Sequence, residues 1–168
     1  MANGLVSLTN RRGVQLLKGR AEFDHSKSVR VHDSEVSHIK FRHAILATGS
    51  RPVPFPETTF TPGGRIISST GALDLADVPE NLLILGGGYV GLELGTVYAA
   101  LGSRVRLVEL EDRLLMGVDQ DLVRPLHRRL EKLFESINLR TRVVSMEDSH
   151  ADVDVPFEGD TDAPRPAF

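Results

Sequence analysis

The stretch that decides the fold is Leu82-Leu83-Ile84-Leu85-Gly86-Gly87-Gly88-Tyr89-Val90-Gly91, an apolar run that ends in a glycine-rich turn. Four successive apolar residues predict a strand. The glycines at positions 86, 88 and 91 have the spacing Gly-x-Gly-x-x-Gly, and the residues after them predict a helix from about Tyr89 to Leu101, which Gly102 ends. A second strand is expected over residues 104–109. We therefore expect a Rossmann-like βαβ unit with a parallel sheet, in an α/β fold.

The glycine-rich turn suits the diphosphate of a dinucleotide. Gly86 permits the tight turn, Gly88 lets the backbone approach the diphosphate, and Gly91 lets the helix lie close to the sheet. The N–H groups at the start of the helix, together with the helix dipole, favour an anion there. The predicted dinucleotide-binding residues in this segment are Gly86, Gly87, Gly88, Tyr89, Val90, Gly91 and Gly95. A plain strand-to-helix connection without a ligand is the alternative interpretation.

Glu109 ends the second predicted strand, 23 positions after Gly86. At this place a carboxylate accepts hydrogen bonds from the adenosine ribose and repels the 2′-phosphate of NADP, so the predicted cofactor is NAD. Three nearby cations leave NADP open as the alternative. They are Arg104 and Arg106, which precede the strand end, and Arg113, which lies beyond it.

The residues before the turn predict a second body. Strands are expected at residues 14–23, 28–32 and 39–48 as a β-meander, and the apolar residues 44–48 indicate a strand covered on both faces. Three prolines within residues 52–56 force an extended connector, which is the expected domain boundary. We thus predict a first domain segment over residues 1–52, a dinucleotide-binding domain over 53–157, and a loop or tail over 158–168.

Further elements are expected on either side of the βαβ unit. Ser68 or Ser69 is predicted to cap a short helical turn that ends near Leu75. A helix capped by Asp119 is predicted over residues 120–137, with a kink at Pro125. Strands are expected at residues 139–146 and 151–157.

The composition excludes several chemistries. The 168 residues carry a net charge of −3 and no cysteine, so this chain supplies no disulfide, no thiol and no cysteine-ligated zinc. No apolar run approaches the roughly 20 residues needed to span a bilayer, and a cytoplasmic location is expected. The histidines show no metal-ligand spacing, so no metal is predicted. One basic cluster is predicted to be a solvated helix face that binds no nucleic acid; it consists of Arg124, His127, Arg128, Arg129 and Lys132.

Several strings together resemble the dihydrolipoamide dehydrogenases, which are flavoproteins of the pyridine nucleotide-disulfide oxidoreductase family. The strings are residues 68–73, 78–85 and 86–95, with further likeness at 19–23, 47–52 and 157–159. The resemblance implies that Ala47, Thr48, Gly49 and Ser50 close an FAD domain near the flavin. It also implies that Glu93 lies toward the nicotinamide and flavin, that Tyr89 lies in the nicotinamide pocket, and that Val143 touches the adenine.

The resemblance also implies what this chain lacks. In the family, an N-terminal glycine fingerprint binds FAD, a cysteine pair forms the redox disulfide, and a C-terminal dimerisation domain supplies a catalytic histidine and glutamate. We therefore expect an internal fragment that is not catalytic alone and has no catalytic residue. The implied partners are the rest of the enzyme, a homodimer partner and a 2-oxoacid dehydrogenase complex.

Two alternatives remain. One is a free-standing NAD-binding module. The other is a related flavoenzyme such as glutathione reductase or mercuric reductase. Glutathione-reductase-like sequences usually have alanine for the third glycine and arginine after the second strand, where this chain has Gly91 and Glu109.

Overall fold

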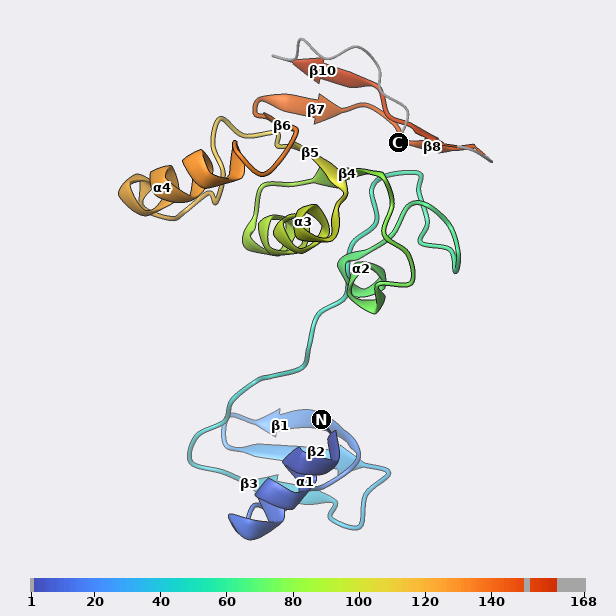
Figure 1. The fold of residues 1–168 in the computed structure, drawn as a ribbon. Coiled ribbons are helices and arrows are strands. Elements are labelled where there is room, and N and C mark those ends of the chain that lie inside the picture. The colour runs from blue at the N-terminus through green and yellow to red at the C-terminus, as the bar shows by residue number, and fades with distance from the viewer. Residues whose placement is uncertain (1, 150–151, 160–168) are drawn as a thin grey trace. The chain divides into compact units, whose positions relative to one another are not determined.

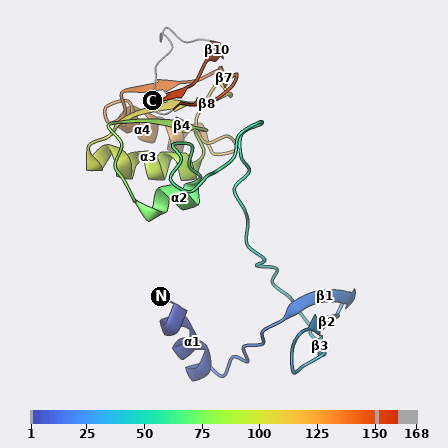
Figure 2. The same cartoon turned by 90° about the vertical axis from the view of Figure 1, so that its right-hand side faces the viewer.

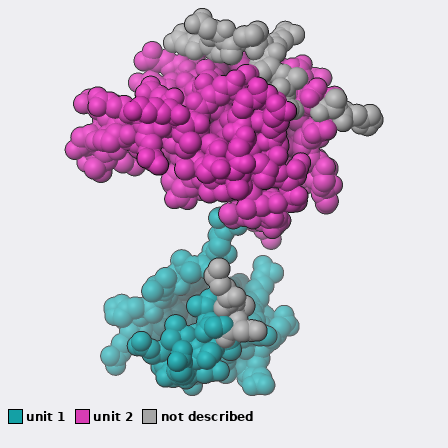
Figure 3. All heavy atoms as spheres, in the orientation of Figure 1, with its two compact units in different colours: residues 1–50 teal, residues 51–168 magenta. Residues whose placement is uncertain are grey.

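The computed structural model describes residues 2–149 and 152–159. The chain divides into two compact units, residues 1–50 and residues 51–168, which Figure 3 shows in different colours. Within the described ranges no helix is both long and apolar enough to cross a membrane. Whether the two units correspond to separate cofactor domains stays a prediction.

The first unit is a helix and a three-stranded antiparallel meander (Figure 1). Helix α1 spans Ala2–Arg11, and strands β1 (Arg20–His25), β2 (Ser28–His32) and β3 (His38–Lys40) follow in the order β1-β2-β3. Phe23 pairs with Val29 and Val29 pairs with Ile39, so apolar residues share one face of the sheet. The Phe23 ring meets the Phe41 ring edge to face, with 5.9 Å between the ring centroids. The predicted meander is therefore confirmed.

The first and third strands of the meander differ from the prediction in their bounds. The first begins at Arg20 instead of residue 14, and the third ends at Lys40 instead of residue 48. The prediction of a strand at residues 44–48 was wrong for this structure, where Ile45 is 94% exposed. A strand needs a neighbour to take its backbone hydrogen bonds, and no described strand lies beside this segment.

The second unit is built on the predicted βαβ unit. Strands β4 (Asn81–Leu85), β5 (Arg104–Val108) and β6 (Ser136–Asn138) form a parallel sheet in the order β4-β5-β6. Helix α3 (Tyr89–Leu101) connects β4 to β5 and lies against one side of the sheet in both Figure 1 and Figure 2. The α/β fold with a parallel sheet is thus confirmed. The glycine turn lies between β4 and α3, so these two elements position the candidate site.

Helix α3 packs on the sheet through Leu92, Gly95 and Tyr98, which are all buried. The Tyr98 hydroxyl donates to the carbonyl oxygen of Ala72 at 2.8 Å, and burial raises the pKa of that phenol. Ala72 belongs to helix α2 (Ser69–Asp74), whose N-cap is Ser68; its hydroxyl accepts from the Gly71 N–H at 3.3 Å. The capped helical turn predicted here is confirmed. Gly102 ends α3 with φ 110°, as predicted.

Helix α4 (Gln120–Leu130) is shorter than predicted. Asp119 is its N-cap residue but its side chain makes no capping hydrogen bond, and Pro125 lies inside the helix. The prediction that this helix reaches Ile137 was wrong because residues 136–138 form β6 instead. The Glu135 N–H donates to the Val105 carbonyl oxygen at 2.8 Å, and Phe134 is buried in the core. Pairing with β5 therefore outweighs continuation of the helix.

The last part of the described chain forms two small antiparallel pairs. Strand β7 (Thr141–Val143) pairs with β10 (Phe157–Gly159), and β8 (Glu147–Asp148) pairs with β9 (Val153–Asp154). The two continuous strands predicted at residues 139–146 and 151–157 are thus each interrupted. Pro156 cannot donate a ladder hydrogen bond, while its carbonyl oxygen accepts from the Val144 N–H at 3.0 Å. The predicted tail begins within β10, and its residues 160–168 lie outside the described residues.

Candidate dinucleotide-binding site

The glycine turn leaves β4 in a conformation that requires its first glycine. Gly86 has φ 101°, a backbone conformation that residues with a side chain rarely adopt. Its N–H donates to the Val108 carbonyl oxygen at 2.8 Å, which continues the pairing of β4 with β5 by one residue. This hydrogen bond therefore anchors the start of the glycine turn at the carboxyl end of the sheet.

Both backbone polar groups of Gly87 bind the loop that follows β5. Its N–H donates to Glu109 Oε2 at 2.6 Å, and its carbonyl oxygen accepts from the Leu115 N–H at 2.9 Å. A Cβ atom on Gly87 would lie 2.5 Å from Leu114 Cδ2, and Leu114 is fully buried. The middle of the turn is thus held from one side by a single loop, residues 109–118.

The other side of the turn is open. A Cβ atom on Gly88 would meet no atom within 4 Å, and this residue is the N-cap of α3 without a capping side chain. Leu92 donates the first helical hydrogen bond, to the Gly88 carbonyl oxygen at 3.1 Å. Among the described residues, the N–H groups of Tyr89, Val90 and Gly91 find no hydrogen-bond acceptor with suitable geometry. A diphosphate fits this side, because it would supply the missing acceptors.

Gly91 and Gly95 are needed for the close packing of α3. A Cβ atom on Gly91 would collide with the Gly86 carbonyl oxygen, and one on Gly95 would lie 2.6 Å from Ile84 Cδ1 and 2.7 Å from Phe134 Cζ. The third glycine of the motif therefore seats the helix on the turn itself, and Gly95 seats it on β4.

Glu109 stands directly after β5 and is half-buried. Its Oε2 accepts from the Gly87 N–H, and its Oε1 accepts from the Glu111 N–H at 2.9 Å. Its own backbone is held by β6 and β7, since its N–H donates to the Asn138 carbonyl oxygen and its carbonyl oxygen accepts from the Thr141 N–H. The structure thus brings the predicted ribose acceptor into direct contact with the glycine turn.

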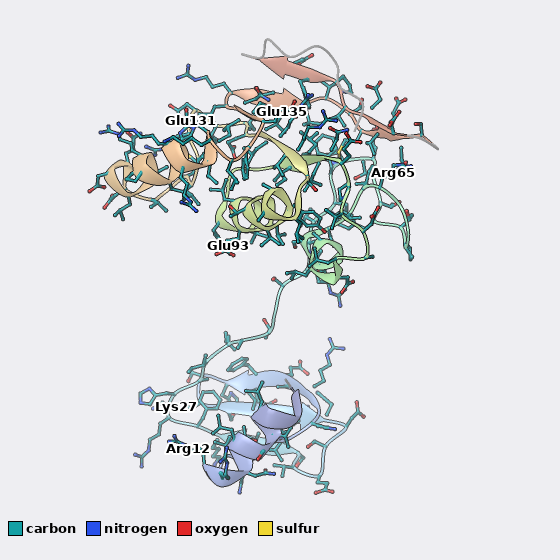
Figure 4. The ribbon with its side chains drawn as sticks, in the orientation of Figure 1. Arg12, Lys27, Arg65, Glu93, Glu131 and Glu135 are labelled. Carbon is teal, nitrogen blue, oxygen red and sulfur yellow. The ribbon has the colours of Figure 1, made fainter. Side chains whose placement is uncertain are left out.

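Three other predicted residues lie on or near α3. Tyr89 is 72% exposed, and Val90 is also exposed. Glu93 is exposed one helical turn beyond Tyr89, and Figure 4 shows its side chain on the side of α3 away from the sheet. Tyr89 and Glu93 therefore share a helix face that is separate from the buried one.

The remaining predicted residues belong to neither the turn nor α3. Val143 ends β7, two residues after Thr141, and is half-buried. The segment predicted to close an FAD domain is exposed and belongs to the first unit; it consists of Ala47, Thr48, Gly49 and Ser50.

Three arginines left NADP as an alternative cofactor in the sequence analysis, and two of them have acidic partners in the structure. Arg104 binds Glu80 with 2.7 Å between nitrogen and oxygen. The Arg106 guanidinium donates to both carboxylate oxygens of Glu135, at 2.9 and 3.0 Å, which lowers the pKa of Glu135 and raises that of Arg106. Arg113 lies in the loop after β5.

Two residues at this site were not predicted from the sequence. Leu114 covers Gly87, and the Leu115 N–H binds the Gly87 carbonyl oxygen. The signal for them was weak: an apolar pair in a polar connection between a strand and a helix. Among the described residues no group of three or more histidines, aspartates or glutamates is arranged to hold a metal ion.

A parallel βαβ unit with a glycine turn, an open helix start and a carboxylate at the end of the second strand defines the dinucleotide-binding class of α/β folds. Residues 1–162 match the pyridine nucleotide-disulphide oxidoreductase family, and the chain belongs to that family.

Individual proteins agree with this assignment. The chain is 40% identical over 163 residues to the dihydrolipoyl dehydrogenase of Haemophilus influenzae, covering 95% of this chain and 33% of that protein. It thus spans about a third of the length of that relative. The HOCl-induced flavoprotein disulfide reductase RclA of Escherichia coli superposes with a TM-score of 0.70 at 28% identity, over 99% of this chain and 37% of that one. LpdA of Mycobacterium tuberculosis, at 24% identity, shares the fold with a TM-score of 0.73 over 98% of this chain and 37% of that one.

Proposed function

We propose that residues 53–157 are an NAD-binding domain and that its cofactor lies against the open side of the glycine turn. The observation that carries this proposal is the contrast within the turn. Gly87 is fully engaged by the loop after β5, whereas Gly88 has an open side and the N–H groups after it have no acceptor among the described residues. A dinucleotide diphosphate is the ligand that complements such a helix start.

In this proposal the N–H groups of Tyr89, Val90 and Gly91 bind diphosphate oxygens, and Glu109 accepts from the adenosine ribose hydroxyls. The negative charge of Glu109 disfavours a 2′-phosphate, and the pairing of Arg104 and Arg106 with glutamates leaves them poorly placed to compensate. From the resemblance to the dihydrolipoamide dehydrogenases, we further propose that Tyr89 and Glu93 face the nicotinamide end and that Val143 faces the adenine. When bound, NAD supplies the carbon that accepts a hydride.

For the whole protein we propose a flavin-dependent dihydrolipoamide dehydrogenase that oxidises dihydrolipoamide with NAD as final hydride acceptor. In it, residues 1–52 belong to an FAD domain, with Ala47, Thr48, Gly49 and Ser50 near the flavin. Support comes from the relatives named dihydrolipoyl dehydrogenase. These 168 residues contain no cysteine, so the redox disulfide of such an enzyme would come from outside them, and we expect no turnover from them alone.

The partners follow from the same proposal: the remainder of the enzyme, a second subunit and a 2-oxoacid dehydrogenase complex. The cytoplasmic location stays a prediction, which cell fractionation would test.

The direct test is the affinity of the chain for NADH and for NADPH, measured by titration calorimetry. We expect NADH to bind more tightly than NADPH. Tighter binding of NADPH would overturn the NAD assignment, and no binding of either nucleotide would overturn the domain assignment itself.

A flavoprotein disulfide reductase with another substrate is the second candidate, favoured by the likeness to RclA. The two candidates share the NAD site and differ in the disulfide substrate. Assays of the whole enzyme with dihydrolipoamide and with other thiols as electron donors would distinguish them, because only the first candidate predicts NAD reduction by dihydrolipoamide.

A further inference from the structure

We infer that Glu109 is also a positioning residue for the diphosphate site: through Gly87 it holds the glycine turn in its binding shape before any ligand arrives. This inference rests on the proposed NAD site and goes beyond the ribose contact. It means that one carboxylate sets both the choice between NAD and NADP and the affinity for the diphosphate that the two nucleotides share.

The contacts of Gly87 carry the argument. This residue precedes the N-cap of α3, so its orientation sets the direction of the N–H groups that follow. Its N–H has one acceptor among the described residues, Glu109 Oε2 at 2.6 Å, and its carbonyl oxygen is held by the Leu115 N–H. Without Glu109, the Gly87 N–H would face the loop with no acceptor there, at a half-buried place where a missing hydrogen bond is costly.

The carboxylate is fixed at its other oxygen too. Glu109 Oε1 accepts from the Glu111 N–H at 2.9 Å, so each oxygen binds a different backbone N–H. Glutamine has a single carbonyl oxygen and turns an NH₂ donor toward the other N–H, so it satisfies only one of them. Aspartate keeps the charge but is one methylene shorter. Each carboxylate oxygen still has a second lone pair, which leaves it free to accept from a ribose hydroxyl.

One consequence concerns the exchange of NAD for NADP. Removing the negative charge of Glu109 relieves its repulsion of a 2′-phosphate, and it also weakens the hold on the Gly87 N–H, because one neutral amide oxygen replaces two carboxylate oxygens. We therefore expect Glu109→Gln to weaken the binding of NADH without a matching gain for NADPH.

The test distinguishes the ribose contact of Glu109 from its positioning role by comparing two ligands. The binding of NADH is compared with that of an analogue whose adenosine ribose lacks both the 2′- and the 3′-hydroxyl. If Glu109 acted only on the ribose, Glu109→Gln would leave the affinity for the analogue unchanged, and that result would overturn the inference. We expect Glu109→Gln to weaken the binding of the analogue as well, by about tenfold, the loss typical of a hydrogen bond to a charged group.

The matched control is Glu111→Gln. It removes the same charge two residues away and keeps the Glu111 N–H, and the exposed Glu111 side chain makes no hydrogen bond or ion pair in the described part of the chain. We expect less than a twofold change in the affinity for either ligand. A loss equal to that of Glu109→Gln would mean that net charge causes the effect, and this too would overturn the inference.

A second measurement needs no ligand. In the free protein, amide hydrogen exchange at Gly87 should be at least tenfold faster in Glu109→Gln and in Glu109→Asp than in the wild type, and unchanged in Glu111→Gln. Unchanged exchange in both Glu109 variants refutes the positioning role, whatever binds. If the wild type binds no NADH, the proposed function fails, and Gly87 exchange still decides this inference. If Glu109→Gln does not fold, Glu109→Asp provides both measurements.

Discussion

Replacing Gly88 by alanine separates the structure of the glycine turn from its ligand. Gly88 has φ −77° and ψ 171°, extended backbone that alanine adopts readily, and the added methyl group would meet no protein atom within 4 Å. Gly88→Ala should therefore leave the free energy of unfolding unchanged or raise it by about 0.4–1 kcal/mol, because alanine restricts the unfolded chain more than glycine does.

The same substitution should strongly impair nucleotide binding. The methyl group would occupy the open side against which the diphosphate is proposed to lie. Loss of one hydrogen bond to the charged diphosphate costs roughly 1.5–3 kcal/mol. Since about 1.4 kcal/mol corresponds to a factor of ten, the dissociation constant for NADH should rise roughly 10- to 150-fold.

The assay pairs NADH titration with urea unfolding of the same preparations. Gly71→Ala is the control, since its added methyl group would lie 3.5 Å from Ile67 Cβ, an ordinary contact, on helix α2. This control should bind NADH as the wild type does. If Gly88→Ala is as stable as the wild type and binds NADH equally well, the diphosphate does not lie against this residue and the reasoning fails.

Three further predictions concern packing and charge around the site. Gly95→Ala should lower the free energy of unfolding by about 1–3 kcal/mol in urea titrations, because its methyl group would press on Ile84 and Phe134; wild-type stability would contradict this. Leu114→Ala should lower the free energy of unfolding by about 2–5 kcal/mol and also weaken NADH binding, because this fully buried side chain packs against Gly87. Unchanged NADH affinity in a folded variant would show that binding does not depend on this contact. Arg106 lowers the pKa of Glu135 below its ordinary value of 4.5, so the stability that their pair contributes is present above that pH and is lost as the pH falls below it. With side chains 29% and 37% exposed, the pair is worth less than about 1 kcal/mol, and Arg106→Gln should remove that acid-dependent part of the unfolding curve.

The local elements around the glycine turn were predictable because their signals lie close together in the sequence. The bounds predicted for α3 agree with the structure, and Ser68 caps α2 as expected. These features depend on periodicity, on a side chain that caps its own helix, and on the left-handed conformation at Gly102. Each of them involves residues within a few positions of one another.

Elements that depend on distant partners were predicted less well. Residues 136–138 continue a helical pattern in the sequence, yet they form β6 because β5 offers a free edge. Residues 44–48 have the composition of a buried strand, yet no described strand takes their hydrogen bonds. An apolar run by itself does not identify its neighbour, and the neighbour decides whether a strand forms.

The same division holds for the site. The spacing of Gly86, Gly88 and Gly91 predicted the tight turn between β4 and α3, and Glu109 was predicted to follow the second strand. That this turn binds a dinucleotide stays a prediction. Only the tertiary structure showed that Glu109 binds the Gly87 N–H and that the loop containing Leu114 and Leu115 holds the turn from one side. The physical reason is that backbone conformation at a glycine is a local property, whereas the partner of a backbone N–H is chosen by how β4, β5 and their loops come together in space.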